Sequence, residues 1–273
     1  MKSILELELL AKKMRGKIVE NAHVNEIPHL GSCLSCVDIL VTLYFKYLNI
    51  DPKNANDFER DRFLLSKGHA APALFFVMAE AGFFPPEALQ DFGSNGSFFH
   101  EHPPAPGFVP GIEAATGSLG HGLPIAAGFA LAGKIRKSSF HSYVLLSDGE
   151  CNEGSVWESA LFISANQLTN ITVLVDLNKW QATGRTDEIL LKNSLKSMWS
   201  SFGWKTVEVN GNDIAELDKV LEKLSKNRSK PVAIIANTTK GKGVSFMEDD
   251  NNWHYKIPNE IEVNLAKKEL GVI

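Results

Sequence analysis

The chain has 273 residues, 44% of them hydrophobic and 22% charged, with a formal net charge of −4. This composition suits a globular protein with a substantial core, and the small negative charge argues against a nucleic-acid-binding surface. No apolar run is long enough to span a bilayer, and the glutamates among the N-terminal leucines argue against a signal peptide.

Three cysteines, an odd number, argue against a disulfide framework and favour a reducing, cytoplasmic setting. The sequence contains no linker, no low-complexity segment and no internal repeat. We therefore expect one cytoplasmic domain spanning residues 1–273, without a nucleic-acid or membrane partner.

Hydrophobic periodicity predicts helices that alternate with short apolar strands. Helices are expected at 2–23, 34–48, from Ala70 onward, at 123–134, 153–167, before 205, and at 213–224 and 259–270. Strands are expected just before Ser66 and at 143–146, 171–177, 205–209 and 231–237. Residues 93–112, rich in Gly, Pro, Ser and Phe, are predicted to form a long loop of the kind that often carries function. The alternation indicates an α/β fold, a parallel sheet flanked by helices.

The most informative stretch is the β-α-β unit between Asp148 and Asn178. One apolar strand ends in Ser147-Asp148-Gly149, and the next strand ends in Asn178. In open α/β sheets ligands bind beyond the carboxyl ends of the strands, and a carboxylate beside an amide oxygen suits a hard cation such as Mg²⁺ holding a phosphate. The alternative, that both are ordinary turn residues, is weakened by the complete β-α-β unit that joins them.

Further polar groups follow predicted strands or precede predicted helices. His69 lies where a strand passes into a helix, a position that favours an anion. We expect Lys67 beside it to be a solvated surface lysine, with phosphate binding as the alternative. His29 precedes the helix at 34–48, where a lone histidine is usually structural. Lys240 and Lys242 lie on a glycine-punctuated loop and are also expected to be solvated.

Two short patterns suggest metals only weakly. Cys33 and Cys36 form a CxxC pair, but there is no second pair, which argues against a metal or redox site. His100 and His102 form an HxH pair for which only Glu101 offers a third ligand.

The stretch from Asp148 to Asn178 resembles the thiamine diphosphate motif, and Asn152-Glu153-Gly154 makes it look most like the transketolase version, although Ser147 replaces the usual Gly. The resemblance implies that Asp148 and Asn178 coordinate Mg²⁺, or Ca²⁺ or Mn²⁺, together with the backbone carbonyl of Trp180. It also implies that the Gly149 N–H contacts the diphosphate, and that Trp180 is a hydrophobic wall or lid.

Four other segments resemble transketolase motifs in the right order, so that the similarity runs from about residue 10 to 265. They are HLGSCLS, LSKGH, TGSLGHG and TTKGKGVSFMEDDNNWH, with His102-Pro103 in the long loop as a further match. The resemblance implies catalytic roles for His29, His102 and His254. It implies cofactor contacts for His69, His254 and the backbone near Gly117 and Leu119. The sequence departs from the family at His121, at Tyr255, at Thr183 and in the HEHPP loop with its extra His100.

The resemblance covers only the first of the three transketolase domains. It therefore implies a two-chain enzyme, α₂β₂, in which a second polypeptide supplies the pyrimidine-binding and C-terminal domains. Such an enzyme transfers a two-carbon ketol unit from a ketose donor to an aldehyde acceptor. Two alternatives stay open. One is a thiamine enzyme that uses 2-oxo acids, either a dehydrogenase α-subunit or an acyl-transferring carboligase, and the other is a non-catalytic homologue. The sequence leaves the donor and the acceptor open.

Overall fold

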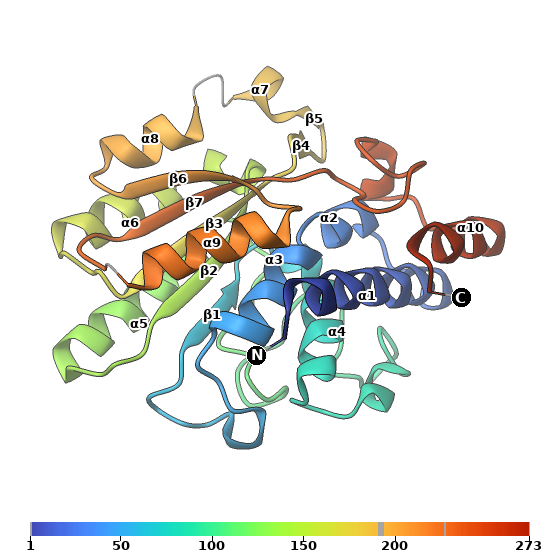
Figure 1. Ribbon diagram of the computed structural model, residues 1–273, viewed down its shortest axis with the longest axis horizontal. Coiled ribbons are helices and arrows are strands. Elements are labelled where there is room, and N and C mark those ends of the chain that lie inside the picture. Colours follow the sequence, from blue (N-terminus) through green and yellow to red (C-terminus); the bar gives the residue numbers. More distant parts are fainter. Residues whose placement is uncertain (1, 191–193, 227, 273) are drawn as a thin grey trace.

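A computed structural model describes residues 2–190, 194–226 and 228–272. Its centre is a five-stranded sheet in the order β1-β2-β3-β7-β6, in which every neighbouring pair is parallel (Figure 1). The strands are β1 (Arg62–Leu65), β2 (Ser142–Ser147), β3 (Ile171–Leu177), β6 (Lys205–Asn210) and β7 (Val232–Asn237). The predicted parallel sheet of an α/β fold is confirmed.

Alternate residues of the strands enter two cores on opposite faces of the sheet. Leu65, Leu145 and Leu174 on one face belong to a core that also contains residues of α1 (Ile4–Val24), α3 (Val37–Thr42), α4 (Ala71–Ala81) and α9 (Ile214–Ser225). The helix α10 (Glu260–Leu270) joins this core and packs against α1. Leu64 and Val144 pack on the other face against α5 (Gly122–Arg136), α6 (Gly154–Ala165) and α8 (Leu195–Ser201). Because both faces are covered, the central strands are mostly apolar, whereas the edge strand β6 (Lys205–Asn210) alternates polar and apolar residues and is only partly buried.

Several helices begin at the residues that the sequence favours. Ser3 caps α1, accepting a hydrogen bond from the Glu6 N–H at 3.3 Å, while the Glu6 side chain bonds back to the Ser3 backbone. Asn259 forms the same reciprocal cap at the start of α10. These caps satisfy N–H groups that a helix terminus leaves unpaired.

The single helix expected at 34–48 is wrong. The chain instead forms α2 (Leu30–Ser35), breaks at Cys36, and continues as α3 and a π-helical turn, η1 (Leu43–Tyr47). Near these breaks the side chains of Ser35 and Thr42 bond backbone carbonyls one turn earlier, at 3.1 and 2.7 Å, which competes with regular helix geometry. Because α2 begins at Leu30, His29 occupies its N-cap position, in a left-handed conformation with φ of 65° and without a side-chain capping hydrogen bond.

A two-stranded hairpin, β4 (Trp180–Gln181) and β5 (Gly184–Arg185), follows β3 and leads into α7 (Thr186–Ile189). The sequence did not predict this hairpin. Residues 93–112 contain no helix or strand, as expected.

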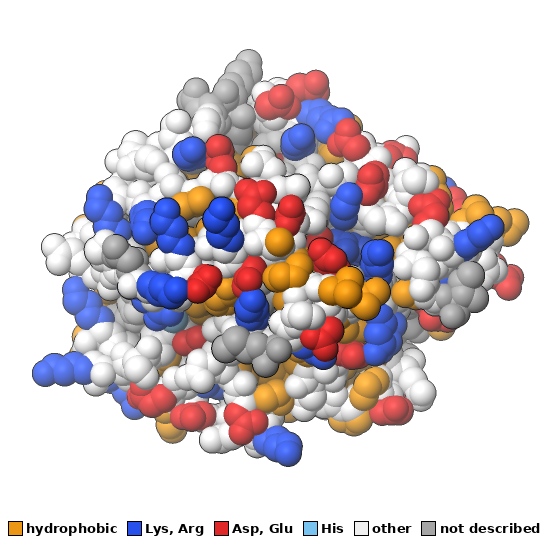
Figure 2. Space-filling view, viewed as in Figure 1, with side chains coloured by type: hydrophobic (Ala, Val, Ile, Leu, Met, Phe, Trp, Pro, Cys, Tyr) orange, Lys and Arg blue, Asp and Glu red, His pale blue; other side chains and the backbone are white. Residues whose placement is uncertain are grey.

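The face seen in Figure 2 carries basic and acidic side chains intermingled, with small groups of hydrophobic side chains between them. Leu5 and Leu9 of α1 are among the exposed hydrophobic residues, at 65% and 57% exposure. None of the helices within the described ranges is long and apolar enough to cross a membrane.

Candidate active site

A cavity of about 540 Å³ opens beyond the carboxyl ends of the strands. Its walls come from segments far apart in the sequence, as expected for a ligand site of an open α/β sheet. Nine of the ten predicted site residues line it: His29, His69, His102, Gly117, Leu119, Gly149, Asn178, Trp180 and His254. The tenth, Asp148, lies fully buried at the end of β2, beside Gly149.

The Asp148 carboxylate accepts three hydrogen bonds. The Gly149 N–H donates to Oδ1 at 3.0 Å, and the Lys179 N–H and the Thr186 hydroxyl donate to Oδ2 at 2.9 and 2.7 Å. Burial raises the pKa of Asp148 to about 6, despite these hydrogen bonds. A nearby cation would favour the ionised carboxylate.

Asn178 lies at the end of β3 and is 2% exposed. Its Oδ1 accepts a hydrogen bond from the Trp180 N–H at 3.1 Å. A buried carboxylate and a buried amide oxygen at adjacent strand ends form the oxygen donor set that a hard divalent cation prefers, so these residues fit Mg²⁺. Within the described residues no three His, Cys, Asp or Glu side chains form a metal-binding group, and the predicted ligand set needs only one such side chain.

Four histidines from four segments converge in the cavity. The His29 ring centroid lies 5.4 Å from that of His69, 6.3 Å from that of His102 and 4.9 Å from that of His254. His69 comes from a 3₁₀ turn after β1, and His254 comes from another 3₁₀ turn near the C-terminus. The structure therefore brings all four predicted histidines together. His100 and His121, in contrast, are exposed and do not line the cavity.

Burial keeps three of these rings, those of His29, His69 and His254, neutral. It lowers the pKa of His29 to about 4, with the other charges in the cluster adding to the effect, and that of His254 to about 3. Burial also takes the pKa of His69 well below its usual value. A neutral imidazole donates through one nitrogen and accepts through the other, which suits hydrogen bonding to sugar hydroxyls or phosphate oxygens.

The expectation that Lys240 is solvated is wrong. Lys240 is fully buried, and its Nζ donates to Asn251 Oδ1 at 2.7 Å and lies 3.1 Å from Nδ1 of His254. Burial, with repulsion from Lys67, lowers the pKa of Lys240 to about 8. Because an ammonium only donates, Nδ1 of His254 is the acceptor and its proton is carried on Nε2.

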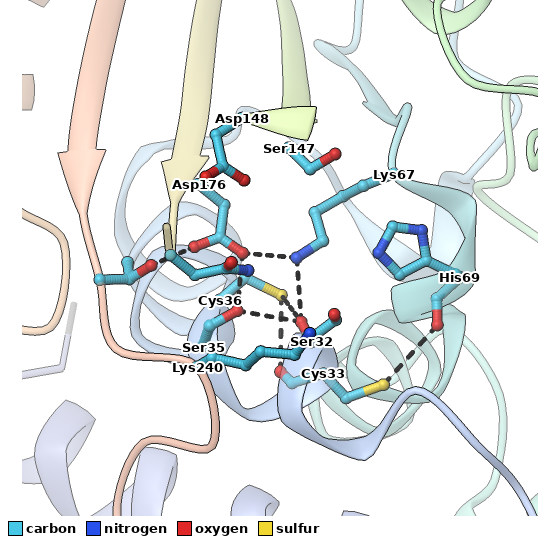
Figure 3. A network of polar contacts seen from close by, with 12 residues as sticks. Ser32, Cys33, Ser35, Cys36, Lys67, His69, Ser147, Asp148, Asp176 and Lys240 are labelled. Carbon is cyan, nitrogen blue, oxygen red and sulfur yellow. Dashed lines mark hydrogen bonds and ion pairs between the residues drawn. The ribbon is translucent and has the colours of Figure 1, made fainter. Parts of the chain in front are cut away.

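The expectation that Lys67 is a solvated surface residue is also wrong. Its side chain is fully buried and forms an ion pair with Asp176, which is also 0% exposed (Figure 3). Its Nζ also donates to the Ser32 carbonyl at 2.9 Å, and Asp176 accepts hydroxyl hydrogen bonds from Ser35 and Thr238. Although burial alone would lower the pKa of Lys67, Asp176 raises it above its usual value.

This ion pair joins three of the segments that carry site residues. Lys67 is two residues from His69, Asp176 is two residues from Asn178, and Ser32 is in α2 behind His29. Sequence reasoning missed the pair, although one signal was present. Asp176 is the one charged residue of β3, a mostly apolar strand, and a charge buried in such a strand needs a partner of opposite charge.

Cys33 and Cys36 are free, buried thiols beside this network. Burial raises the pKa of Cys36 to about 12 and that of Cys33 even further, so neither is a thiolate at neutral pH. They pack as core residues of α2 and its C-terminal end.

Two features of the cavity wall are suited to a bound ligand. Nδ1 of His29 and Nε2 of Gln181 are buried and have no hydrogen-bond partner among the described residues. A Glu101 carboxylate oxygen lies 3.9 Å from Nδ1 of His29, beyond hydrogen-bond distance. At Gly117, where φ is 149°, a Cβ would lie 2.7 Å from the His102 ring, so only glycine lets the backbone pass this close.

Residues 8–273 match the family model for the transketolase thiamine diphosphate-binding domain. A protein of Actinobacillus succinogenes, named as one of the subunits of an apulose-4-phosphate transketolase, is 44% identical over 266 residues, which cover 97% of this chain and 96% of that protein. The protein of the same name from Phocaeicola vulgatus is 37% identical over 265 residues, covering 97% of this chain and 94% of that protein.

The crystal structure of transketolase from Campylobacter jejuni matches with a TM-score of 0.89 at 29% identity, covering 99% of this chain and 43% of that chain. The fold inferred from the motifs is thus confirmed, as is the resemblance to separate N-terminal transketolase chains. The chain belongs to the transketolase family of transferases and corresponds to its N-terminal, thiamine diphosphate-binding part.

Proposed function

We propose that this chain binds thiamine diphosphate and Mg²⁺ and is the cofactor-anchoring subunit of a two-chain transketolase. The enzyme would transfer a two-carbon ketol unit from a ketose donor to an aldehyde acceptor. The observation that carries the proposal is the cavity at the strand ends, where neutral histidines meet buried oxygen ligands and glycine backbone.

The proposed contacts follow from the residues present. Asp148, Asn178 and the backbone carbonyl of Trp180 would hold the cation, and Ca²⁺ or Mn²⁺ could replace Mg²⁺ there. His69, His254 and the Gly149 N–H would contact the diphosphate. The backbone at Gly117 and Leu119, which also line the cavity, would contact the pyrimidine ring.

The cofactor, when bound, supplies the electron sink for breaking and forming the C–C bond. The part of this chain is to position the sugar and to exchange protons with its oxygens. His29, His102 and His254 are proposed for that role because all three line the cavity, and because burial keeps His29 and His254 neutral. Lys240 holds the His254 proton on Nε2, so this ring would donate from Nε2 and not from Nδ1.

A second polypeptide is part of the proposal. The chain covers 43% of the single-chain Campylobacter jejuni transketolase, while two relatives that it matches along almost their whole length are named as transketolase subunits. We infer a partner that carries the pyrimidine-binding and C-terminal domains, in an α₂β₂ assembly located in the cytoplasm. This chain is proposed to act as one domain over residues 1–273.

Calorimetric titration of the purified chain with thiamine diphosphate, with and without Mg²⁺, tests the binding step. Saturable binding that requires the cation is expected, and absence of binding in the presence of Mg²⁺ would favour a non-catalytic homologue. His121→Ala serves as a control, because His121 is exposed and outside the cavity.

Activity requires the chain paired with its partner. Apulose 4-phosphate, the compound in the names of two relatives, is the first donor to test, followed by other ketose phosphates and by pyruvate. Ketol transfer from a ketose phosphate supports the proposal. Turnover of pyruvate alone would favour the carboligase, and full activity of this chain without a partner would overturn the two-chain architecture.

A further inference from the structure

The hairpin formed by β4 and β5 covers one side of the cavity. Trp180 and Gln181 of its first strand, with Ala182 and Thr183 of its turn, line the cavity wall. The next residue after the hairpin, Thr186, donates its hydroxyl to Asp148. The position of this hairpin therefore decides how the cavity is closed on the side of the predicted metal ligands.

Three side chains attach the hairpin to the segment that contains Asp249. They are Trp180, Arg185 and Asp249, and we call them the clasp. Trp180 and Arg185 are paired across the two strands, and the guanidinium carbon of Arg185 lies 3.8 Å from the centroid of the Trp180 ring. Arg185 donates from Nη1 and Nη2 to the two oxygens of Asp249, both at 2.7 Å. The Trp180 Nε1–H donates to the same carboxylate at 2.8 Å.

Asp249 belongs to the segment that carries Lys240 and His254, so the clasp joins two walls of the cavity. The Asp249 N–H donates to the Lys240 carbonyl at 2.9 Å, and its backbone is left-handed, with φ of 57°. Asn251 adds a second connection by donating to the Ala182 carbonyl at 3.2 Å. A left-handed backbone is uncommon for Asp. At Asp249 hydrogen bonds of both the backbone and the side chain hold this conformation in place.

The clasp contributes little to the stability of the fold. The side chains of Arg185 and Asp249 are 30% and 54% exposed, and exposed ion pairs are weak and screened by salt. Its effect is instead local. A two-stranded hairpin is at best marginally stable by itself, so contacts to the rest of the protein decide how often it opens.

We propose that Arg185 and Asp249 are positioning residues that hold Trp180 and Gln181 against the cavity and so set the rate at which a diphosphate cofactor escapes. The inference rests on the proposed binding of thiamine diphosphate. The two-pronged pairing and the stacking are specific to arginine, because a lysine ammonium forms neither the fork nor the planar stack.

Hydrogen exchange of the full chain without ligand tests the clasp separately from the cofactor. In Asp249→Asn, which removes the charge but keeps the shape, the Lys179 and Thr186 amides are expected to exchange about 3- to 10-fold faster than in the wild type. Arg185→Lys is expected to behave similarly. The matched control is Glu222→Gln, which removes an exposed ion pair of 2.7 Å on α9, a helix that contributes no residue to the cavity lining. This substitution should leave the exchange rates of both amides unchanged.

The second measurement is the release of thiamine diphosphate from the Mg²⁺-loaded full chain, followed after rapid addition of a chelator. Asp249→Asn is expected to release the cofactor about 3- to 10-fold faster than the wild type and Glu222→Gln. High salt should speed release from the wild type more than from Asp249→Asn.

The possible outcomes separate the two proposals. Equal release rates or equal amide exchange in Asp249→Asn and the wild type would overturn the clasp while leaving the proposed function in place. Failure of the wild-type chain itself to bind the cofactor with Mg²⁺ would overturn the proposed function, and the retention role with it.

Discussion

Replacing Lys67 by Met tests whether the buried ion pair beneath the cavity organises the site. The substitution removes an ammonium that is 0% exposed and leaves the Asp176 carboxylate, also 0% exposed, with only hydroxyl donors. Removing one partner of a buried pair costs about 3–5 kcal/mol. We expect a loss of about 3 kcal/mol in the free energy of unfolding, the lower end, because the hydroxyls of Ser35 and Thr238 still hydrogen-bond the carboxylate.

The assay is urea unfolding of the purified full chain, with thermal unfolding as a second measurement. A loss of about 3 kcal/mol corresponds to a fall of roughly 6–12 °C in Tm for a chain of this size. The control is Lys226→Met at the C-terminal end of α9, where the Lys226–Glu222 pair of 2.7 Å has side chains 71% and 62% exposed. An effect within about 0.5 kcal/mol is expected there.

A double-mutant cycle tests the reasoning more directly. Asp176→Asn alone leaves the Lys67 ammonium without its counter-charge, and we expect a similar loss of about 3 kcal/mol. The double variant has no buried charge from this pair, so its loss should be at least about 2 kcal/mol smaller than the sum of the two single losses. Additive effects, or a Lys67→Met variant as stable as Lys226→Met, would refute the assignment of a coupled buried pair.

Three further predictions concern the metal site, acid stability and a tight turn. Asp148→Ala should abolish Mg²⁺-dependent binding of thiamine diphosphate in calorimetry, because it removes the only carboxylate of the predicted ligand set. Unchanged affinity would show that other residues bind the metal. His141 is 2% exposed and its pKa is lowered well below the usual 6.5, mainly by burial. Since the unfolded chain binds the proton more readily, stability is greatest above pH 6.5 and falls as the pH drops below it, by about 1.4 kcal/mol from this group at pH 5.5. His141→Gln should therefore flatten the decline in urea-unfolding free energy between pH 7.5 and 5.5, and an unaltered slope would contradict the assignment. Gly241 has φ of 77°, and an added Cβ would lie 2.1 Å from the Met247 carbonyl oxygen. Gly241→Ala should lower the free energy of unfolding well beyond the cost at Gly96, which has φ of 86° but open space around it; equal losses by urea unfolding would disprove the steric argument.

The sequence by itself determined the sheet and most of the cavity. Strands buried on both faces appear as unbroken apolar runs, and polar residues directly after such runs mark the carboxyl edge of a parallel sheet. That local rule placed Asp148, Asn178 and His69 at one edge, and the motif resemblance added His29, His102 and His254. In the structure the ring centroids of His69, His102 and His254 all lie 6.3 Å or less from that of His29.

Only the tertiary structure decided the surroundings of the charged residues. The sequence predicts solvated side chains for Lys67, at a strand end, and for Lys240, on a glycine-punctuated loop, because lysines are mostly exposed, yet both are buried. Their partners, Asp176 and Asn251, are separated from them in sequence, by 109 residues in the case of Lys67. Burial and charge pairing depend on such long-range contacts, which hydrophobic periodicity does not encode. The clasp between Arg185 and Asp249 escaped sequence reasoning for the same physical reason, because its two halves meet only after the chain has folded.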